Sequence, residues 1–427
     1  MQANWSTILY DWHTQETTNL PYMPYAVRVY PASAASTMLP LTPANNYQAT
    51  LLFCGGSAPP DWGSDGGIKY NITAGESSRG RVWRGSVVVA FIVLTRSFAL
   101  AVAADDSCVR ISPDAANPAY TDDDFLPEGR TMGQFVYLPD GTLWMGNGAQ
   151  MGTAGYGTEG WGKGQSYADV PIYRPGLYDP NQPKGSRWNW NLASSTQERL
   201  YHSTVVLLKD GSLLISGSNP NADVETATFP TSYSVERWYP KWFNEQRPGN
   251  QGFPEVLSYG GDYWSMTLNT TDETLVKSAK VNVIRGGFST HAIQFGQRFL
   301  ELMTSYEIDT VAGTTTLYVT QMPPNAALFT PGPAMLFLVV DGVPSYGKYV
   351  MVGSGQIGTQ PIAEAATLPT SGTKATETPS AATESAAAAT GTARVQASSN
   401  SNAGVASVAA PLGMTLVFGL VSAWVAL

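Results

Sequence analysis

Basic residues are scarce in this sequence. Charged residues make up only 13% of the 427 positions, and 24 Lys and Arg face 33 Asp and Glu, for a formal net charge of −9. Binding to nucleic acid needs clustered Lys and Arg that neutralise phosphates, and we find no such cluster. The composition therefore argues against a nucleic-acid partner.

Cysteine is nearly absent. The two cysteines, Cys54 and Cys108, lie too far apart for the short spacing of a metal finger. In a secreted protein the pair most simply forms one disulfide. Two buried free thiols are the alternative.

Aromatic and turn-forming residues are plentiful instead. Aromatics reach 11%, with 42 Gly and 29 Pro, which is typical of many short strands joined by tight turns. Residues 133–148 and 203–217 repeat one pattern: an apolar strand, an Asp-Gly turn and a second strand that ends in small residues. A less regular relative, residues 49–57, contains the Gly-Gly common to kelch-type blades. A β-sandwich could also produce short strands with such turns, but the Gly-Gly favours a β-propeller.

The repeat stops near Tyr233, and a different pattern follows. Residues 279–285 largely alternate small or apolar with polar residues, while residues 334–340 are continuously apolar and end at Asp341-Gly342. A stretch of roughly 120 residues with several such strands suits one immunoglobulin-like sandwich.

Histidine is also scarce, with three copies. Two of them, His202 beside Tyr201 and His291 in residues 286–294, lie in distinctive motifs. Imidazole nitrogens and a phenolate oxygen suit a tetragonal copper(II) centre. Adjacent side chains on a strand point to opposite faces, so Tyr201 and His202 converge only where the backbone bends. The alternative is a tyrosine at a strand edge beside a solvated histidine. His13 lies in no such motif and is expected to be structural or exposed.

With these motifs, residues 23–26, 39–47, 128–133 and 323–326 resemble the copper radical oxidases, and most closely the fungal glyoxal oxidases. The resemblance implies an all-β chain: a kelch-type seven-bladed β-propeller followed by an immunoglobulin-like (early-set) β-sandwich. It implies copper on the propeller axis, with Tyr201 as axial ligand and base, and His202 and His291 as equatorial ligands. His291 would be delivered by a loop of the sandwich.

The domain boundaries follow from the resemblance. Residues 1–228 are expected to be the later propeller blades, and residues 229–356 the galactose oxidase-like sandwich. Seven blades need on the order of 300 residues, and about 225 precede the sandwich, so the first blades are expected to be missing. Arg130, two residues ahead of Met132 in the repeat, is a weaker candidate for the substrate side; the alternative is a surface salt bridge.

The same absence affects the chemistry. The family carries a thioether-linked Cys-Tyr radical cofactor on early blades, and no motif here matches either residue. The resemblance implies oxidation of small aldehydes or primary alcohols by O₂ to give H₂O₂, with peroxidases as possible users of that product. We expect the chain as given to be inactive. A non-catalytic, glycolipid-anchored propeller with a cell-wall or adhesion role is the alternative.

The remaining expectations concern processing. Residues 80–103 are an anomalous apolar insertion, interpreted as a translated intron or, failing that, a buried strand. Residues 357–404 are rich in Ser, Thr and Ala, as in a stalk, and residues 405–427 resemble a glycolipid-anchor signal with attachment near Asn402; a tail-anchored helix is the alternative. Such an anchor implies a secreted protein of the cell surface or wall. It also implies an N-terminal signal peptide, and the residues after Met1 do not have the pattern of one. Sequons at Asn4, Asn71 and Asn269 are compatible with glycosylation.

Overall fold

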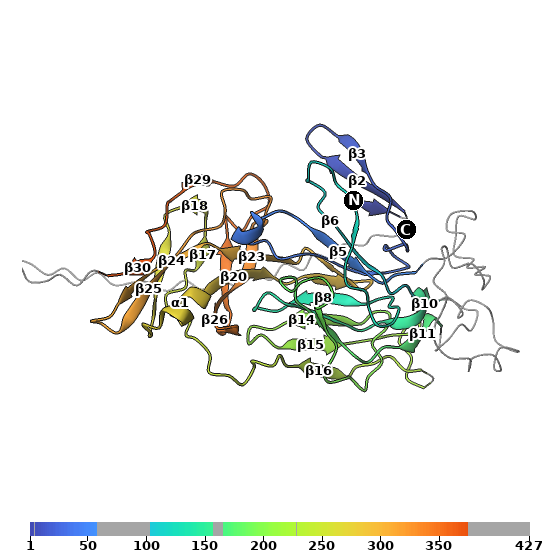
Figure 1. Cartoon of the computed structure of the whole chain (residues 1–427). Coiled ribbons are helices and arrows are strands. Elements are labelled where there is room, and N and C mark those ends of the chain that lie inside the picture. Colours follow the sequence, from blue (N-terminus) through green and yellow to red (C-terminus); the bar gives the residue numbers. More distant parts are fainter. Residues whose placement is uncertain (4, 58–102, 157–164, 228, 375–427) are drawn as a thin grey trace, which may run out of the picture. The chain divides into compact units, whose positions relative to one another are not determined.

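A computed structural model describes residues 1–3, 5–57, 103–156, 165–227 and 229–374 (Figure 1). Within these residues, helix is confined to α1 (Glu273–Ser278) and the short 3₁₀ turn η1 (Pro43–Asn45). Everything else that is regular is strand, so the expected all-β class is confirmed. None of the helices described is long and apolar enough to cross a membrane. The residue 80–103 interpretation, the stalk beyond residue 374, Asn402 and the anchor signal fall outside the described residues.

Three antiparallel sheets in succession form the propeller blades. The first blade has the strand order β4 (Ala35–Met38), β5 (Leu51–Cys54), β6 (Cys108–Ile111) and β7 (Thr121–Asp122). The second has the order β8 (Gln134–Tyr137), β9 (Leu143–Gly146), β12 (Gly176–Tyr178) and β13 (Trp188–Asn189). The third has β14 (Thr204–Leu207), β15 (Leu213–Ser216) and β16 (Val235–Trp238), which lie side by side in Figure 1.

The two Asp-Gly turns fold alike. Gly141 and Gly211 both have positive φ, at 90° and 80°, a conformation that glycine adopts without a Cβ penalty. Asp140 Oδ1 accepts bonds from the Thr142 N–H and hydroxyl at 3.1 and 2.7 Å. Asp210 accepts the matching pair from Ser212. The repeat predicted from the sequence is confirmed.

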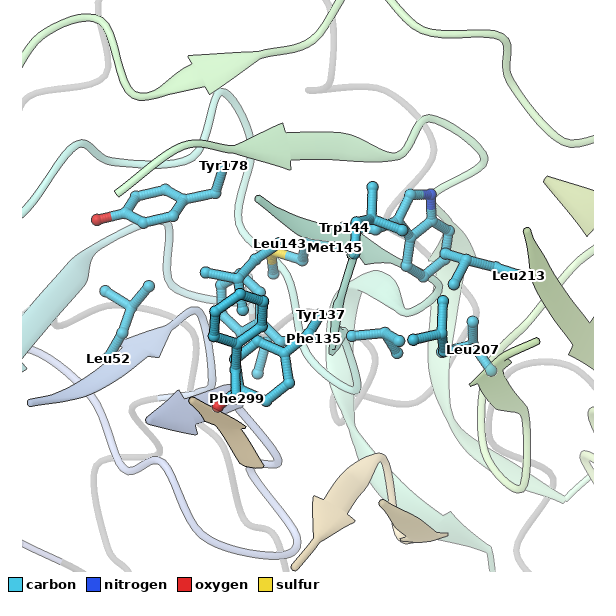
Figure 2. Close-up of a cluster of buried hydrophobic side chains, with 14 of the residues drawn as sticks. Leu52, Phe135, Tyr137, Leu143, Trp144, Met145, Tyr178, Leu207, Leu213 and Phe299 are labelled. Atoms are coloured by element: carbon cyan, nitrogen blue, oxygen red, sulfur yellow. The ribbon is translucent and has the colours of Figure 1, made fainter. Parts of the chain in front are cut away.

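The blades share one buried apolar core (Figure 2). Residues of the inner strands enter it, alternately in β14 and β15 and consecutively in β8 and β9. Side chains of the sandwich reach it as well: Phe299 lies 5.7 Å from Tyr137, ring centre to ring centre. The labelled core residues are Leu52, Phe135, Tyr137, Leu143, Trp144, Met145, Tyr178, Leu207, Leu213 and Phe299. Because both parts bury residues in this core, the sandwich is held against the blades by apolar burial.

The sandwich follows the third blade. One sheet has the order β17 (Val256–Leu257), β28 (Lys348–Val352), β26 (Gly332–Val340), β20 (Lys280–Arg285) and β23 (Arg298–Leu302), with β27 (Val343–Pro344) paired to β26. The other has β19 (Trp264–Leu268), β25 (Thr314–Val319), β24 (Thr304–Asp309) and β30 (Gly372–Thr373). The continuously apolar strand β26 is central, which accounts for its composition.

Four smaller pairings complete the described strands. They are β1 (Gln2–Ala3), β2 (Ser6–Asp11) and β3 (Glu16–Leu20) in one sheet; β10 (Ala149–Tyr156) with β11 (Ser166–Pro171); β18 (Tyr259–Gly261) with β29 (Ile362–Ala365); and the hairpin of β21 (Phe288–Thr290) and β22 (Ile293–Phe295). Exposed β29 and β30 add to the sandwich beyond residue 356 but bury little. β16 pairs with β15 beyond residue 228, so the third blade extends to Trp238.

A buried arginine ties the strands together in each blade. The Nη1 atoms of Arg28, Arg130 and Arg199 donate to Gly55 O, Asn147 O and Gly217 O, where the second strand of each blade ends. The same guanidinium groups also bond to Ser107, to Arg174 O and to Ser234, just ahead of each third strand. Each arginine thus replaces backbone pairing that the sheet loses at this end.

Asp123 is the hub of a buried ionic group in the blades. Its side chain is fully buried and accepts bonds from Arg187 Nη1 at 2.7 Å and Tyr178 Oη at 2.8 Å, beside Arg110. Burial alone would raise the pKa of Asp123, but the bond from Arg187 and its other partners lower it overall.

We expect Asp123→Asn to destabilise the fold by about 3 kcal/mol at pH 7, because it leaves the partly buried guanidinium groups of Arg110 and Arg187 without their counter-charge. The lowered pKa means that the carboxylate stabilises the fold above about pH 4, and that this contribution disappears as pH falls through the folded-state pKa. Denaturant unfolding of both proteins between pH 7 and pH 3 measures the difference. If the difference in unfolding free energy between the two proteins stays constant from pH 7 to pH 3, this account is wrong.

Candidate metal site

The backbone bends at Tyr201 and His202, as the strand argument requires. His202 has φ of 62°, in a turn two residues ahead of β14. Met132, at the matching place ahead of β8, has φ of 57°. At the end of β15, a Cβ on Gly217 would lie 2.5 Å from His202 O, so only glycine lets the two strands close against this turn.

The bend brings both side chains to the same side. The rings of Tyr201 and His202 stack with centroids 3.9 Å apart and planes 27° apart. Tyr201 is 5% exposed, while His202 is exposed. Two potential ligands therefore come from adjacent positions, which a regular strand forbids.

His291 lies at the tip of the β21–β22 hairpin. Thr290 pairs with Ile293, so His291 and Ala292 form a two-residue turn, with φ of 53° and 67°. Such a turn ordinarily takes Asn-Gly or Asp-Gly. Two residues with side chains in the left-handed region are costly, and such backbones cluster at functional sites. The hairpin packs against β4, β8 and β14 of the blades.

The three side chains converge. The His291 ring centroid lies 5.8 Å from that of Tyr201 and 6.3 Å from that of His202. A metal lies about 2 Å from a ligating imidazole nitrogen, which places two opposed ring centres roughly 6 Å apart. The observed separation of the histidines fits one ion shared between them. Two nitrogens and a phenol oxygen are also donors that copper(II) accepts.

The direction of the His202 pKa shift suits metal binding. Desolvation by its neighbours, and then the charge of His291, lower the pKa of His202, which favours the neutral imidazole that binds metals. Burial, and then a hydrogen bond with Tyr30, raise the pKa of Tyr201, so its phenol must lose a proton to become an anionic ligand. His291 Nδ1 lies 2.7 Å from Thr290 Oγ1, which leaves Nε2 for a ligand.

Two tyrosines that the motifs did not indicate complete the cluster. Tyr30 lies edge-on to His291 at 4.9 Å and shares the hydrogen bond with Tyr201. Tyr156, the last residue of β10, lies 5.8 Å from Tyr201 and 6.1 Å from His202. Both are partly exposed, at 43% and 38%. They form an aromatic rim beside the candidate ligands.

The sequence carried a signal for Tyr30. Arg28 and Arg199 play the same part in their blades, and each is followed two residues later by a tyrosine, Tyr30 or Tyr201. Counting two residues on from each of these arginines leads to a tyrosine, although Arg28 lies seven residues ahead of β4 and Arg199 five ahead of β14. We find no comparable signal for Tyr156.

The other sequence candidates lie apart from the cluster. Arg130 is 1% exposed and bonds to backbone carbonyls and, at 3.5 Å, to Glu128, which is a structural arrangement. His13 stacks on Trp12 at 3.6 Å on an exposed turn. Asn269 is exposed in a bend after β19, whereas Asn4 and Asn71 lie outside the described residues. Cys54 and Cys108 form the expected disulfide, with an S–S length of 2.04 Å.

In the part of the chain that the structure describes, no group of three or more His, Cys, Asp and Glu could hold a metal ion. Any metal at the cluster therefore depends on the tyrosine as well as on the two histidines.

Comparisons with known proteins agree with this architecture. Residues 82–242 match the glyoxal oxidase N-terminus family, and residues 247–352 match the galactose oxidase-like early set domain. The first match begins inside the segment interpreted as an insertion, and the second begins after β16. The third blade and the sandwich thus fall into separate families.

Similar proteins include plant oxidases. The chain is 32% identical over 359 residues to "Aldehyde oxidase GLOX" of Vitis pseudoreticulata, covering 82% of this chain and 59% of that protein. It is 28% identical over 345 residues to "Aldehyde oxidase GLOX1" of Arabidopsis thaliana, covering 78% and 49%. The chain therefore spans about half to three fifths of these relatives' length.

A solved structure shows the same fold. It is a fungal alcohol oxidase in complex with copper, with a TM-score of 0.51 and 17% identity over 78% of this chain and 57% of that one. That likeness supports a propeller followed by a sandwich. This chain therefore carries a glyoxal oxidase N-terminus match followed by a galactose oxidase-like early set domain match, and its sequence is similar to plant aldehyde oxidases.

Proposed function

We propose that the protein belongs to a copper radical oxidase that oxidises small aldehydes or primary alcohols with O₂ and gives H₂O₂. The observation that carries the proposal is the convergence of His202, His291 and Tyr201 from the turn ahead of β14 and the tip of the β21–β22 hairpin, with both histidines at positive φ. The named activity of the aldehyde oxidase relatives supports the substrate class.

Each residue of the cluster has a distinct role in this proposal. His202 and His291 would hold copper through ring nitrogens, and Tyr201 through its phenol oxygen. A bound copper ion supplies one-electron redox chemistry toward the substrate and O₂. Tyr201, deprotonated, is the group placed to accept the hydroxyl proton of an alcohol or aldehyde hydrate. Tyr30 and Tyr156 shield one side of this proton acceptor from water.

The chain as given is proposed to bind copper without turning over substrate. A radical cofactor of the Cys-Tyr type needs a cysteine, and both cysteines of this chain are joined in the disulfide. This observation is also what favours the second candidate, a non-catalytic propeller with a cell-wall or adhesion role. We further propose secretion and a glycolipid anchor, with peroxidases as users of the H₂O₂ formed by the complete oxidase.

Titration of the full chain with copper(II), followed by calorimetry and electron paramagnetic resonance, tests the site. We expect one ion per chain in a tetragonal nitrogen and oxygen environment. A peroxide assay with glyoxal and glycerol then tests turnover, and we expect no H₂O₂ above the copper-only background. Absence of copper binding would refute the proposed site, and rapid peroxide formation would refute the proposed inactivity.

A further inference from the structure

Gln134 is a buried polar side chain that the copper proposal leaves unexplained. It is the first residue of β8 and is fully buried, with 0% exposure. The matching first residues of β4 and β14 are Ala35 and Thr204. An amide with several hydrogen-bonding groups at such a position is costly unless its partners are in place.

One end of the Gln134 amide holds the His202 segment. Its Nε2 donates to Ser203 O at 2.9 Å and lies 3.3 Å from Ser203 Oγ. Ser203 is the residue after His202, and its hydroxyl also accepts from Asn147 Nδ2 at 3.2 Å. The turn that presents Tyr201 and His202 is therefore fixed to the second blade by side-chain hydrogen bonds.

The other end of the same amide holds the His291 hairpin. Gln134 Oε1 accepts from Gln294 Nε2 at 3.0 Å and from Ser289 Oγ at 3.3 Å. These two residues flank His291 on opposite strands of the hairpin. Gln294 also donates to Val205 O at 2.8 Å, which lies in β14 directly after the His202 turn.

We propose that Gln134 is a positioning residue that fixes the separation of the two histidine-bearing segments, and hence the geometry of the metal site. The inference rests on the proposed function. Apolar burial alone allows a hairpin to shift along its neighbours, whereas directional bonds at both ends of one amide fix its register. Outer residues that orient metal ligands commonly contribute 10- to 100-fold to metal affinity.

The test compares copper(II) binding by the full chain and by variants. Gln134→Met keeps side-chain length and removes both ends of the bridge, and we expect the Kd for copper(II) to rise about 10- to 100-fold, with a shifted paramagnetic resonance spectrum. Gln294→Met, which breaks one half of the bridge, is expected to raise the Kd for copper(II) and to shift the resonance spectrum in the same direction. In the double variant the losses should not add, because both act through one bridge.

Gln297→Met is the matched control. Gln297 is also a buried glutamine, and its Nε2 donates to Phe135 O at 3.1 Å and lies 3.3 Å from Thr37 Oγ1, but it does not touch the histidine-bearing turn. We expect comparable thermal destabilisation with a copper Kd within about threefold of the unmodified chain, since the ligands keep their geometry. If the unmodified chain binds copper and Gln134→Met binds it equally well, the inference is wrong and the site remains. If the unmodified chain binds no copper, both the proposed copper site and the positioning role of Gln134 are wrong.

Discussion

Replacing His202 or His291 with alanine is expected to weaken copper(II) binding more than 100-fold. Each histidine supplies a direct ligand, so its loss should exceed the 10- to 100-fold effect typical of outer residues. The remaining imidazole and the Tyr201 phenol leave the ion too few donors for a tetragonal site. Calorimetric titration of the full chain at pH 7 measures the change, and loss of nitrogen hyperfine structure in the resonance spectrum identifies the missing ligand.

His13 provides the control within the same chain. It is the third histidine, lies on an exposed turn and has its backbone N–H bonded to Asp11 Oδ1 at 2.8 Å. His13→Ala should leave copper binding unchanged. If it weakens binding as much as His291→Ala does, copper is held non-specifically by surface imidazole, and the convergence of the cluster has no functional meaning.

The local parts of the fold could be predicted from the sequence because they are set by short-range chemistry. The Asp140-Gly141 and Asp210-Gly211 turns need a carboxylate that accepts two bonds and a glycine with positive φ. The bend at His202 was expected from side-chain alternation once Tyr201 and His202 were both taken as ligands of one metal. The continuously apolar run of residues 334–340 likewise predicted a strand, which the structure places at the centre of its sheet as β26.

The long-range contacts that build the site could not be predicted from local sequence patterns. Gln134 and Gln294 meet across 160 residues of chain, and the motifs that contain them give no sign of this contact. Tyr156 joins the cluster only because β10 leads there. The positive φ of His291 and Ala292 opposes ordinary turn preferences, so propensity argues against the hairpin that the structure contains. The pairing of Cys54 with Cys108 in the first blade was a long-range contact that could be suggested because the chain has only two cysteines.

Removing this disulfide is expected to produce the largest loss of stability. The bridge joins residues 54 apart in sequence, and confining a loop of this length in the unfolded chain stabilises the fold by about 4 kcal/mol in the chain-entropy model. Cys54 and Cys108 also lie opposite each other in β5 and β6, fully buried in the blade core. The Cys54→Ala, Cys108→Ala variant therefore loses packing as well as the cross-link.

Denaturant unfolding of this double variant, with and without a reducing agent, separates these contributions. The unmodified chain should lose about 4 kcal/mol when it is reduced, whereas the variant should be insensitive to reductant and at least as unstable as the reduced chain. The bridge joins β5 and β6 of the first blade, whereas Tyr201, His202 and His291 lie ahead of β14 and in the β21–β22 hairpin, so the folded variant should still bind copper(II) with unchanged affinity. A loss below about 1 kcal/mol would mean that the segment between the cysteines is already confined in the unfolded chain. The bridge would then hold the first blade together only weakly, and apolar burial would be its main support.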